Sequence, residues 1–292
     1  MIESVPPTLD FLVPGPLRQR TGGYLYDARM VDGLRRLGWD VRVHNLEGTF
    51  PDGDYHARDA LAGALSSLPA GARVVLDGLS MGGIPDPLRM HAGRLGMLAL
   101  VHHPLADESG LDAARRARLR TSERDALAQC KGVIVTSAFT AERLTTYAVP
   151  AARIRTVLPG TDPAPLAEGP GPGEPPALLC VGTVIPRKGH DVLIDALARI
   201  RALPWTCVCA GSLDRDPDHA RMVIERAARA KLAERVRFLG ECDPDRLDAL
   251  YHRSSLFVLA SRYEGYGMAF AEALMRGLPV IGTTGGAIPG TV

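Results

Sequence analysis

The segment Ser261–Glu272 carries two carboxylates, Glu264 and Glu272, on either side of a Gly-Tyr-Gly stretch. It follows an apolar run typical of a strand and leads into a helical pattern that starts near Met268. Carboxylates accept hydrogen bonds from hydroxyls, and the amides at a helix start favour a phosphate. Eight residues of ideal helix would separate the glutamates by about 12 Å, more than the usual carboxylate spacing in glycosidases. The pair is therefore expected to grip two ends of an extended ligand.

A second segment, Val181–Gly189, places the adjacent cations Arg187 and Lys188 in a loop after another apolar run. Two neighbouring positive charges suit a diphosphate. Taken alone, such a pair more often begins a solvated helix. Its occurrence together with the glutamate segment favours a diphosphate grip.

Short apolar runs alternate with helical patterns along the whole chain, which predicts parallel α/β structure. Six prolines and three glycines in residues 163–176 predict a linker. The expected domains are 1–162 and 177–292, and open sheets of this kind bind ligands beyond the carboxyl ends of their strands. Strands are expected at Leu9–Val13, Asp40–Leu46, Arg73–Leu79, Met97–His102, Gly132–Ser137 and Arg153–Leu158, and then at Ala177–Val184, Thr206–Ala210, Val236–Gly240, Leu256–Ser261 and Pro279–Gly282.

The two segments, in this order and separation, resemble the retaining GT-B glycosyltransferases called glycosyl transferases group 1, of sequence family four. The resemblance is close from residue 177 to Pro289 and looser in the first domain, where Thr21-Gly22-Gly23 and His102-His103-Pro104 carry it. It implies two Rossmann-like domains with a cleft between them. It also implies a hexose-type sugar moved from a nucleotide-diphosphate sugar to an acceptor hydroxyl, with retention of configuration and with no cofactor or metal. The acceptor class is open: a glycan, a lipid or a small molecule.

Carried over by position, the resemblance implies that Glu264 holds sugar hydroxyls, Glu272 holds the ribose, and Arg187 with Lys188 neutralises the diphosphate. His102 is expected beside the transferred sugar, although the adjacent His103 would point the opposite way, and the sequence does not decide between them. The expected catalytic residues are His102, Arg187, Lys188 and Glu264, and the expected donor-binding residues are Gly22, Gly23, Gly182, Arg187, Lys188, Glu264, Gly265, Tyr266, Gly267, Met268 and Glu272.

Other functions fit the sequence less well. Asp214-Arg-Asp216 matches a short metal motif of another glycosyltransferase fold, but the two cations already supply positive charge, so we interpret it as a loop that caps the next helix. No Gly-x-Gly-x-x-Gly follows the first strand of either domain, which disfavours a nicotinamide-dependent oxidoreductase. A nucleotide-sugar-binding protein without catalysis remains the alternative. Gly290 stands where the family usually has a glutamate before further elements, so we expect a truncated second domain, and an inactive fragment is a second alternative.

Composition limits the setting and the partners. The formal net charge of +1 gives no reason to expect nucleic acid. The five cysteines show no paired zinc spacing and are interpreted as reduced core residues, which indicates a cytoplasmic protein. The start of the chain lacks the features of a signal peptide, and no apolar run reaches membrane-spanning length, about 18 residues. Peripheral contact with a membrane is left open.

Overall fold

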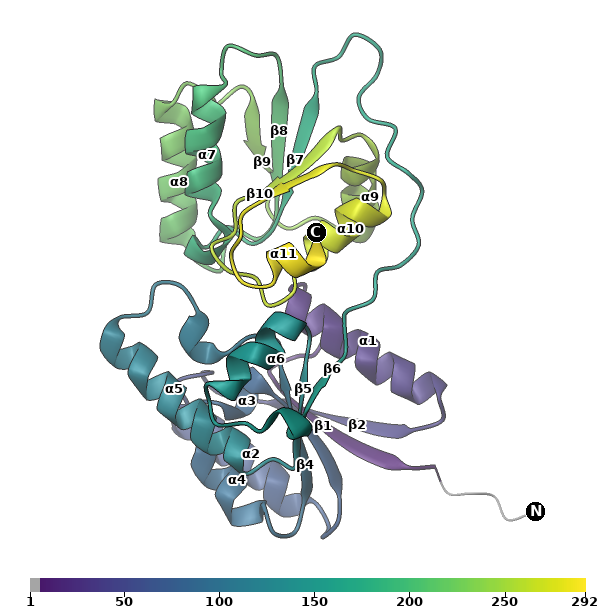
Figure 1. The fold of residues 1–292 in the computed structure, drawn as a ribbon, viewed down its shortest axis with the longest axis vertical. Helices are drawn as coiled ribbons and strands as arrows, with labels where there is room; N and C mark the ends of the chain where they lie inside the picture. The colour runs from purple at the N-terminus through teal and green to yellow at the C-terminus, as the bar shows by residue number, and fades with distance from the viewer. Residues whose placement is uncertain (1–5) are drawn as a thin grey trace, which may run out of the picture. The chain divides into compact units, whose positions relative to one another are not determined.

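The computed structural model describes residues 6–292, and the chain divides into two compact units, one ending at Pro159 and the other spanning Gly160–Val292. Each unit contains one sheet whose strand pairs are all parallel, with helices on its faces (Figure 1). This arrangement confirms the expected α/β class with two Rossmann-like domains.

Unit 1 holds a six-stranded sheet in the order β2-β1-β3-β4-β5-β6. Helix α2 shows how its helices attach: Ala57, Leu61 and Leu65 recur every four residues, so they form one apolar stripe, and all three are fully buried. The elements are β1 (Thr8–Pro14), α1 (Gly22–Arg36), β2 (Asp40–Leu46), α2 (Tyr55–Ser67), β3 (Arg73–Asp77), α3 (Gly78–Met81), α4 (Pro85–His91), β4 (Gly96–Val101), η1 (Leu105–Asp107), α5 (Ala113–Ala128), β5 (Gly132–Val135), α6 (Ala138–Thr145), η2 (Ala151–Arg153) and β6 (Ile154–Thr156).

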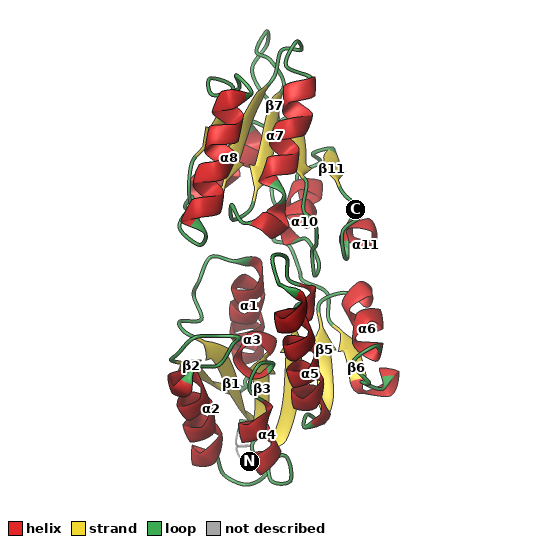
Figure 2. Ribbon diagram, turned by 90° about the vertical axis from the view of Figure 1, so that its left-hand side faces the viewer, coloured by secondary structure: helices red, strands yellow, loops and turns green. Residues whose placement is uncertain are grey.

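Unit 2 holds a five-stranded sheet in the order β11-β10-β7-β8-β9, with α7 and α8 lying side by side against it (Figure 2). On α7, the buried apolar side chains are Leu193, Ile194 and Leu197, which therefore form the inner face of the helix. Their spacing is that of an amphipathic helix. The elements are β7 (Ala177–Val181), η3 (Pro186–Lys188), α7 (His190–Arg199), β8 (Thr206–Ala210), α8 (Pro217–Arg229), β9 (Val236–Phe238), α9 (Pro244–His252), β10 (Leu256–Leu259), α10 (Met268–Met275), β11 (Val280–Gly282) and α11 (Ile288–Thr291).

All eleven expected strands are present, with ends that differ by a few residues. The clearest difference is at residues 78–79, which were expected to extend β3 but begin the short helix α3. The carboxylate of Asp77 accepts a hydrogen bond from the amide of Leu79 at 2.8 Å and so caps that helix. The cap turns the chain out of the sheet at Asp77.

The Pro- and Gly-rich stretch is not a free tether. The amide of Ala167 donates to the carbonyl of Arg276 at 2.8 Å, and the amide of Glu168 donates to that of His252 at 2.9 Å. These bonds tie residues 163–176 to unit 2, so the unit boundary lies after Pro159, three residues before the expected end of the first domain.

Candidate functional site

The order of the strands places the candidate segments of unit 2 at a switch point. β7 has β8 on one side and β10 on the other, so the chain leaves β7 and β10 in opposite directions around the sheet. Ligands of open α/β sheets bind where such connections diverge, beyond the carboxyl ends of the strands. The loop after β7 carries Arg187 and Lys188, and the loop after β10 carries Glu264.

Glu264 lies at the centre of an ion cluster formed by these two loops. Its Oε1 accepts from Nζ of Lys188 at 2.6 Å and from Oγ of Ser261 at 2.5 Å. Its Oε2 lies 3.5 Å from a guanidinium nitrogen of Arg187, which also donates to the carbonyl of Tyr263 at 3.1 Å. All three charged side chains are at most 16% exposed. The structure thus brings together Arg187, Lys188 and Glu264, three of the residues named as candidates from the sequence.

The charges of this cluster keep Glu264 ionised. Burial by itself would raise the pKa of Glu264, but the charges of Lys188 and Arg187 and the hydrogen bonds from Lys188 and Ser261 bring it below its ordinary value. Two cations facing one carboxylate leave one net positive charge, in a place screened from water. The remaining positive charge therefore favours the binding of a further anion beside Glu264.

Backbone conformations that only glycine adopts easily hold the two loops together. Gly189 has φ +64, and a Cβ there would lie 2.0 Å from the carbonyl oxygen of Ala260. Gly286 has φ +67 and forms an isolated bridge with Glu264, whose carbonyl accepts from the amide of Ala287 at 2.8 Å. The loops after β7, β10 and β11 therefore fit against one another at backbone distance.

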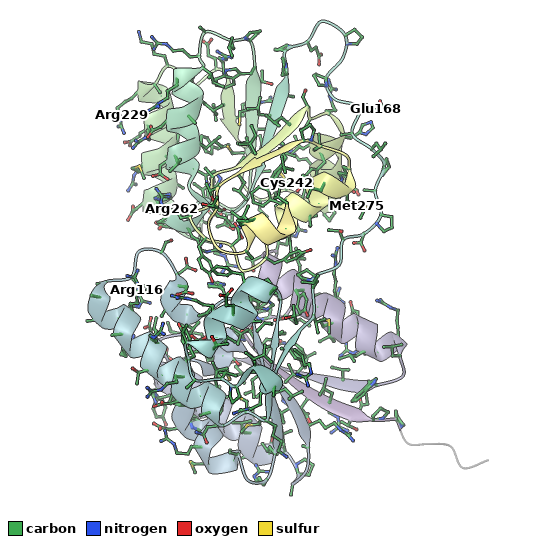
Figure 3. The ribbon with its side chains drawn as sticks, viewed as in Figure 1. Arg116, Glu168, Arg229, Cys242, Arg262 and Met275 are labelled. Carbon is green, nitrogen blue, oxygen red and sulfur yellow. The ribbon has the colours of Figure 1, made fainter. Side chains whose placement is uncertain are left out.

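Arg262, labelled in Figure 3, adds a side-chain tie between the same loops. Its backbone amide donates to the carbonyl of Arg187 at 2.7 Å, and its guanidinium donates to the carbonyl of Pro186 at 2.6 Å. The guanidinium also makes a two-pronged pair with Asp191 at 2.9 and 2.6 Å. Arg262 thus orients the Arg187–Lys188 loop from outside, a role the sequence analysis did not assign.

Glu272 lies on α10 and accepts a hydrogen bond from a buried core residue. Its Oε2 accepts from the hydroxyl of Tyr251 at 3.1 Å, and the ring of Tyr251 stacks on Phe257. The helix starts only at Met268, after Gly267 at φ +101, so the ideal-helix separation of about 12 Å does not apply to the two glutamates. Glu264 belongs to the loop and Glu272 to the second turn of the helix.

Of the other expected donor residues of unit 2, Gly182 and Gly267 approach side chains of this cluster. A Cβ on Gly182 would touch the Lys188 side chain at 3.4 Å. The carbonyl of Tyr266 accepts from the hydroxyl of Thr291 at 2.6 Å, and Gly265 lies between Tyr266 and Glu264. Gly267 caps α10, which begins at Met268, with no capping side chain. The amides of Phe270 and Ala271 donate to the carbonyl of Gly267, at 3.0 and 3.3 Å.

Unit 1 gathers His102, Asp27 and Asp77 at its own switch point, beside β1 and β3. Nε2 of His102 lies 3.0 Å from Oδ1 of Asp27 and 3.4 Å from Oδ2 of Asp77, and both carboxylates are buried. Gly23 approaches the same ring, since a Cβ there would lie 3.1 Å from Cδ2 of His102. Gly22 and Gly23 are the first residues of α1, and Thr21 supplies no capping side-chain bond. The structure therefore brings the expected glycine pair and His102 together.

The structure also separates the two histidines. Nε2 of His103 lies 3.4 Å from Glu108, away from the Asp27–Asp77 pair. The neighbours thus point to different partners, as alternation at a strand end predicts, and His102 is the one that meets Gly23.

Two carboxylates change the protonation of His102. Burial by itself would lower its pKa, but the charge of Asp27 and the hydrogen bonds to Asp27 and Asp77 raise it to about 10. Protonated His102 therefore stabilises the folded state fully below the unfolded value of 6.5, and this contribution is lost as the pH rises toward 10. Near pH 7 the ring is a cation whose Nε2–H is committed to carboxylates.

Replacement of Asp27 with asparagine is expected to lower the pKa of His102, because the replacement removes the charge that offsets burial. Titration of the imidazole by NMR would show His102 protonated across pH 6–8 in the parent chain and titrating at lower pH in Asp27→Asn. Asp86→Asn, at an exposed pair with Arg89, serves as the control and should leave the titration unchanged. An unchanged His102 titration in Asp27→Asn would contradict the assigned pairing.

Sequence reasoning missed Asp27, Asp77 and Ser261. Asp27 lies on α1, four residues after Gly23, and Asp77 is the last residue of β3. A polar residue at a strand end was an available signal for Asp77. Nothing local marks Asp27, because its partner lies 75 residues away.

The motif Asp214-Arg-Asp216 caps a helix, as expected. The carboxylate of Asp216 caps α8 by accepting from the amide of His219 at 3.0 Å, and Asp214 is exposed in the preceding loop. The capping interpretation of Asp214-Arg-Asp216 is therefore confirmed.

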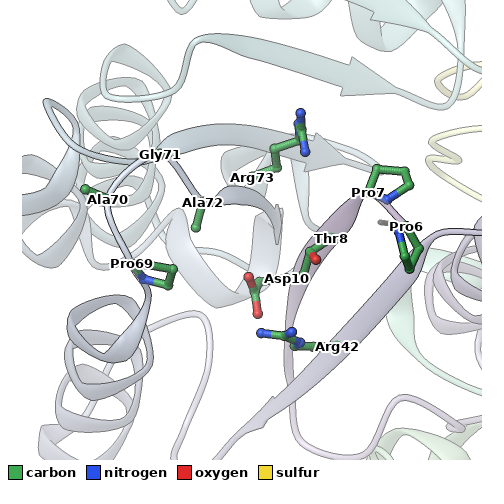
Figure 4. A pocket seen from close by; sticks show the side chains of 10 residues that line it. All are labelled: Pro6, Pro7, Thr8, Asp10, Arg42, Pro69, Ala70, Gly71, Ala72 and Arg73. Carbon is green, nitrogen blue, oxygen red and sulfur yellow. The ribbon is translucent and has the colours of Figure 1, made fainter. Parts of the chain in front are cut away.

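A hollow of about 590 Å³ lies elsewhere, at the amino ends of β1 and β3 (Figure 4). Its lining includes Asp10, Arg42 and Arg73. Asp10 is already paired with His44 at 2.8 Å. Since the candidate residues of unit 1 stand at the opposite, carboxyl ends of these strands, the hollow is separate from them.

Comparison with known proteins identifies the class. The profile of the family described as glycosyl transferases group 1 matches residues 167–292. That stretch belongs to the family, and the chain has the GT-B fold.

Particular relatives share parts of the chain. A GDP-mannose-dependent alpha-(1-6)-phosphatidylinositol monomannoside mannosyltransferase of Mycolicibacterium smegmatis is 28% identical over 70% of this chain and 56% of its own length. A D-inositol 3-phosphate glycosyltransferase of Nocardia farcinica is 32% identical over 58% of this chain and 41% of its own length. The matched stretches thus span about half of these curated relatives.

Solved structures agree on the fold. Sucrose-phosphate synthase from Thermosynechococcus elongatus superposes with a TM-score of 0.80 at 22% identity, over 98% of this chain and 83% of that one. Anabaena HepE in complex with UDP and glucose gives a TM-score of 0.71 at 18% identity, over 98% and 83%. Across residues 6–292, none of the helices combines the length and the apolar character needed to cross a bilayer.

Proposed function

We propose that this chain transfers a hexose-type sugar from a nucleotide-diphosphate sugar to an acceptor hydroxyl with retention of configuration. The observation that carries the proposal is the ion cluster in which Arg187 and Lys188 share the buried carboxylate of Glu264. The ion cluster lies within residues 167–292, which match the family profile, and at a switch point of the sheet. Two relatives are named as mannosyltransferases, and the name of one specifies GDP-mannose, so GDP-mannose is the first donor to test.

In the proposed mechanism, Arg187 and Lys188 bind the diphosphate and stabilise the charge that develops as the sugar bond breaks. Their positions are fixed before the donor arrives, because Glu264, Tyr263 and Arg262 hold the two side chains and their backbone. A preorganised pair of cations loses little energy to rearrangement during the reaction. The positive charge comes from the protein, so the mechanism requires no metal ion.

Glu264 is proposed to act twice. Oε1 keeps Lys188 in place, while Oε2, with its longer contact to Arg187, retains acceptor capacity for a sugar hydroxyl. Glu272 is proposed to accept from the ribose, with Tyr251 orienting its carboxylate. Gly22 and Gly23 offer backbone amides at the start of α1.

On the acceptor side, we propose that His102 contacts the transferred sugar as a fixed imidazolium. Since its Nε2–H is held by Asp27 and Asp77, it is not the base that deprotonates the acceptor. A departing phosphate oxygen is the proposed base. The acceptor, a glycan, lipid or small molecule, is proposed without a finer choice.

The donor is tested by thermal shift with GDP-, UDP-, ADP- and dTDP-sugars on the purified chain. One base series is expected to raise the melting temperature, because a ligand at a hundred times its dissociation constant stabilises by about 2.7 kcal/mol. The donor so found is then assayed for nucleoside diphosphate release with candidate acceptors, and NMR of the product reads its anomeric configuration. Metal independence predicts the same rate after chelation.

Three results would contradict the proposal. No shift with any nucleotide sugar would remove the donor site. A shift with NADH alone would revive an oxidoreductase. A donor shift with no release of nucleoside diphosphate for any acceptor would favour a binding protein without catalysis.

A further inference from the structure

Three side chains able to bind metal meet in the core of unit 2, below the Arg187–Lys188 loop. They are Cys180 on β7, Cys209 on β8 and His190 on α7, and each is at most 2% exposed. Their sulfur and nitrogen ligand atoms all lie within 4.8 Å of one another. The proposed transfer reaction uses none of them.

The fold brings these residues together from three separate elements. Cys180 and Cys209 are Cα partners in the register of the neighbouring strands β7 and β8. Partners on adjacent parallel strands project to the same face of the sheet. His190 is the first residue of α7, which packs its apolar stripe into the same core. The cluster is thus where one end of α7 meets two central strands.

The separation of the ligand atoms suits a tetrahedral zinc ion. Sγ of Cys180 lies 3.6 Å from Nε2 of His190. Zinc–sulfur bonds of about 2.3 Å and zinc–nitrogen bonds of about 2.0–2.1 Å, at a tetrahedral angle, place the two ligand atoms about 3.6 Å apart. Thiolate and imidazole are also the ligands that structural zinc sites use.

Ordinary hydrogen bonding accounts poorly for the buried imidazole. Within residues 6–292, Nδ1 of His190 has no hydrogen-bond partner although the atom is buried. Its Nε2 faces sulfur, which is a weak acceptor. A zinc–Nε2 bond would give that nitrogen a strong partner, whereas Nδ1 would keep none among the described residues.

We propose that Cys180, Cys209 and His190 bind a structural zinc ion. Cys207 is the candidate for the fourth ligand, because it is buried and lies two residues before Cys209 on the same face of β8. Its side chain would have to turn toward the ion, since, of these side chains, only the ligand atoms of Cys180, Cys209 and His190 lie within 4.8 Å of one another. Two cysteine thiolates already balance the charge of Zn²⁺, and a closed, four-ligand site is typical of structural zinc.

The ion would fasten the start of α7 to β7 and β8. His190 follows Lys188 by two residues, so this tie would also fix the loop that carries both cations. Zinc at this place would therefore stabilise the geometry of the ion cluster without contacting the nucleotide-sugar donor.

The test uses the full chain produced in zinc-supplemented medium and freed of loosely bound metal by chelation. We expect about one zinc per chain by elemental analysis. X-ray absorption at the zinc edge should show sulfur and nitrogen neighbours at about 2.3 and 2.0–2.1 Å. Co²⁺ exchanged into the site should show thiolate-to-metal charge-transfer absorption. These measurements on the unmodified chain do not depend on a variant that folds.

Variants then assign the ligands. Cys209→Ser and His190→Ala should lose the ion and the charge-transfer absorption, and Cys207→Ser should weaken retention during chelation. Cys242→Ser, at a half-buried cysteine of the same unit labelled in Figure 3, is the matched control and should retain the ion. Absence of metal from the unmodified chain would overturn the proposal in favour of a hydrogen-bonded thiol cluster. Retention of the ion by folded Cys209→Ser would overturn the assignment of the site.

Discussion

Lys188→Met is expected to lower kcat/KM for sugar transfer by about 10²–10³-fold, the usual effect of removing one preorganised group that stabilises developing negative charge. The ammonium lies 2.6 Å from Oε1 of Glu264 and is largely buried, so water cannot replace its charge effectively. Steady-state kinetics with the donor identified by thermal shift measures the loss. Arg229→Met, at an exposed cation of α8 labelled in Figure 3, is the control and should change kcat/KM little.

The same variant should also lose stability, because it leaves the buried carboxylate of Glu264 with fewer partners. Breaking a buried pair by removing one member costs about 3–5 kcal/mol, and Arg187 and Ser261 should reduce that cost here. Since the folded pKa of Glu264 is lowered, its ionisation stabilises the parent chain above about pH 4.5, and this contribution is lost as the pH falls through the folded pKa. In Lys188→Met, this acid-dependent contribution should be smaller.

The double variant Lys188→Met/Glu264→Gln separates the two effects. It removes one charge of each sign, so stability should recover in part, because Arg187 also loses its carboxylate partner, while transfer stays impaired. Recovery of activity together with stability would mean that Lys188 only neutralises Glu264 and does not bind the diphosphate. Glu264→Gln is preferable to Glu264→Ala because its amide keeps the volume and can still accept from Ser261.

Gly189→Ala is expected to destabilise unit 2 by roughly 2–5 kcal/mol. A left-handed conformation costs a non-glycine residue roughly 1–2 kcal/mol, and overpacking adds typically 1–3 kcal/mol. At φ +64 the new Cβ would lie 2.0 Å from the carbonyl of Ala260, which is backbone and cannot rotate away. The loop between β7 and α7 would have to shift, so sugar transfer should fall as well.

Gly240→Ala provides a matched control in the same unit. Gly240 has φ +72 but no atom within 4 Å of the added Cβ, so only the conformational cost applies. Urea unfolding in a Trp39→Phe background would report unit 2 through the buried Trp205. Equal stability of the two glycine variants would show that the loop relaxes and that the close approach to Ala260 is not a constraint.

Much of the fold was predictable because its signals are local. The period of apolar residues marked every strand, and β2 and β8 were predicted with the bounds observed. The end of β3 was misjudged because the residues after Asp77 are apolar, and burial in α3 gives the same signal as burial in a strand. The Pro- and Gly-rich stretch had the composition of a linker, but its backbone bonds to Arg276 and His252 lie outside any local pattern.

The sequence by itself predicted the two α/β units and, through the group 1 resemblance, named Arg187, Lys188 and Glu264 as candidate site residues. Only the tertiary structure decided that one carboxylate lies between both cations, that Asp27 and Asp77 hold His102, and that Cys180, His190 and Cys209 share one core position. The physical reason is that strand and helix periods follow from the geometry of neighbouring residues. Contacts such as that between Lys188 and Glu264, 76 residues apart, depend on the order and register of whole strands, which no short segment encodes.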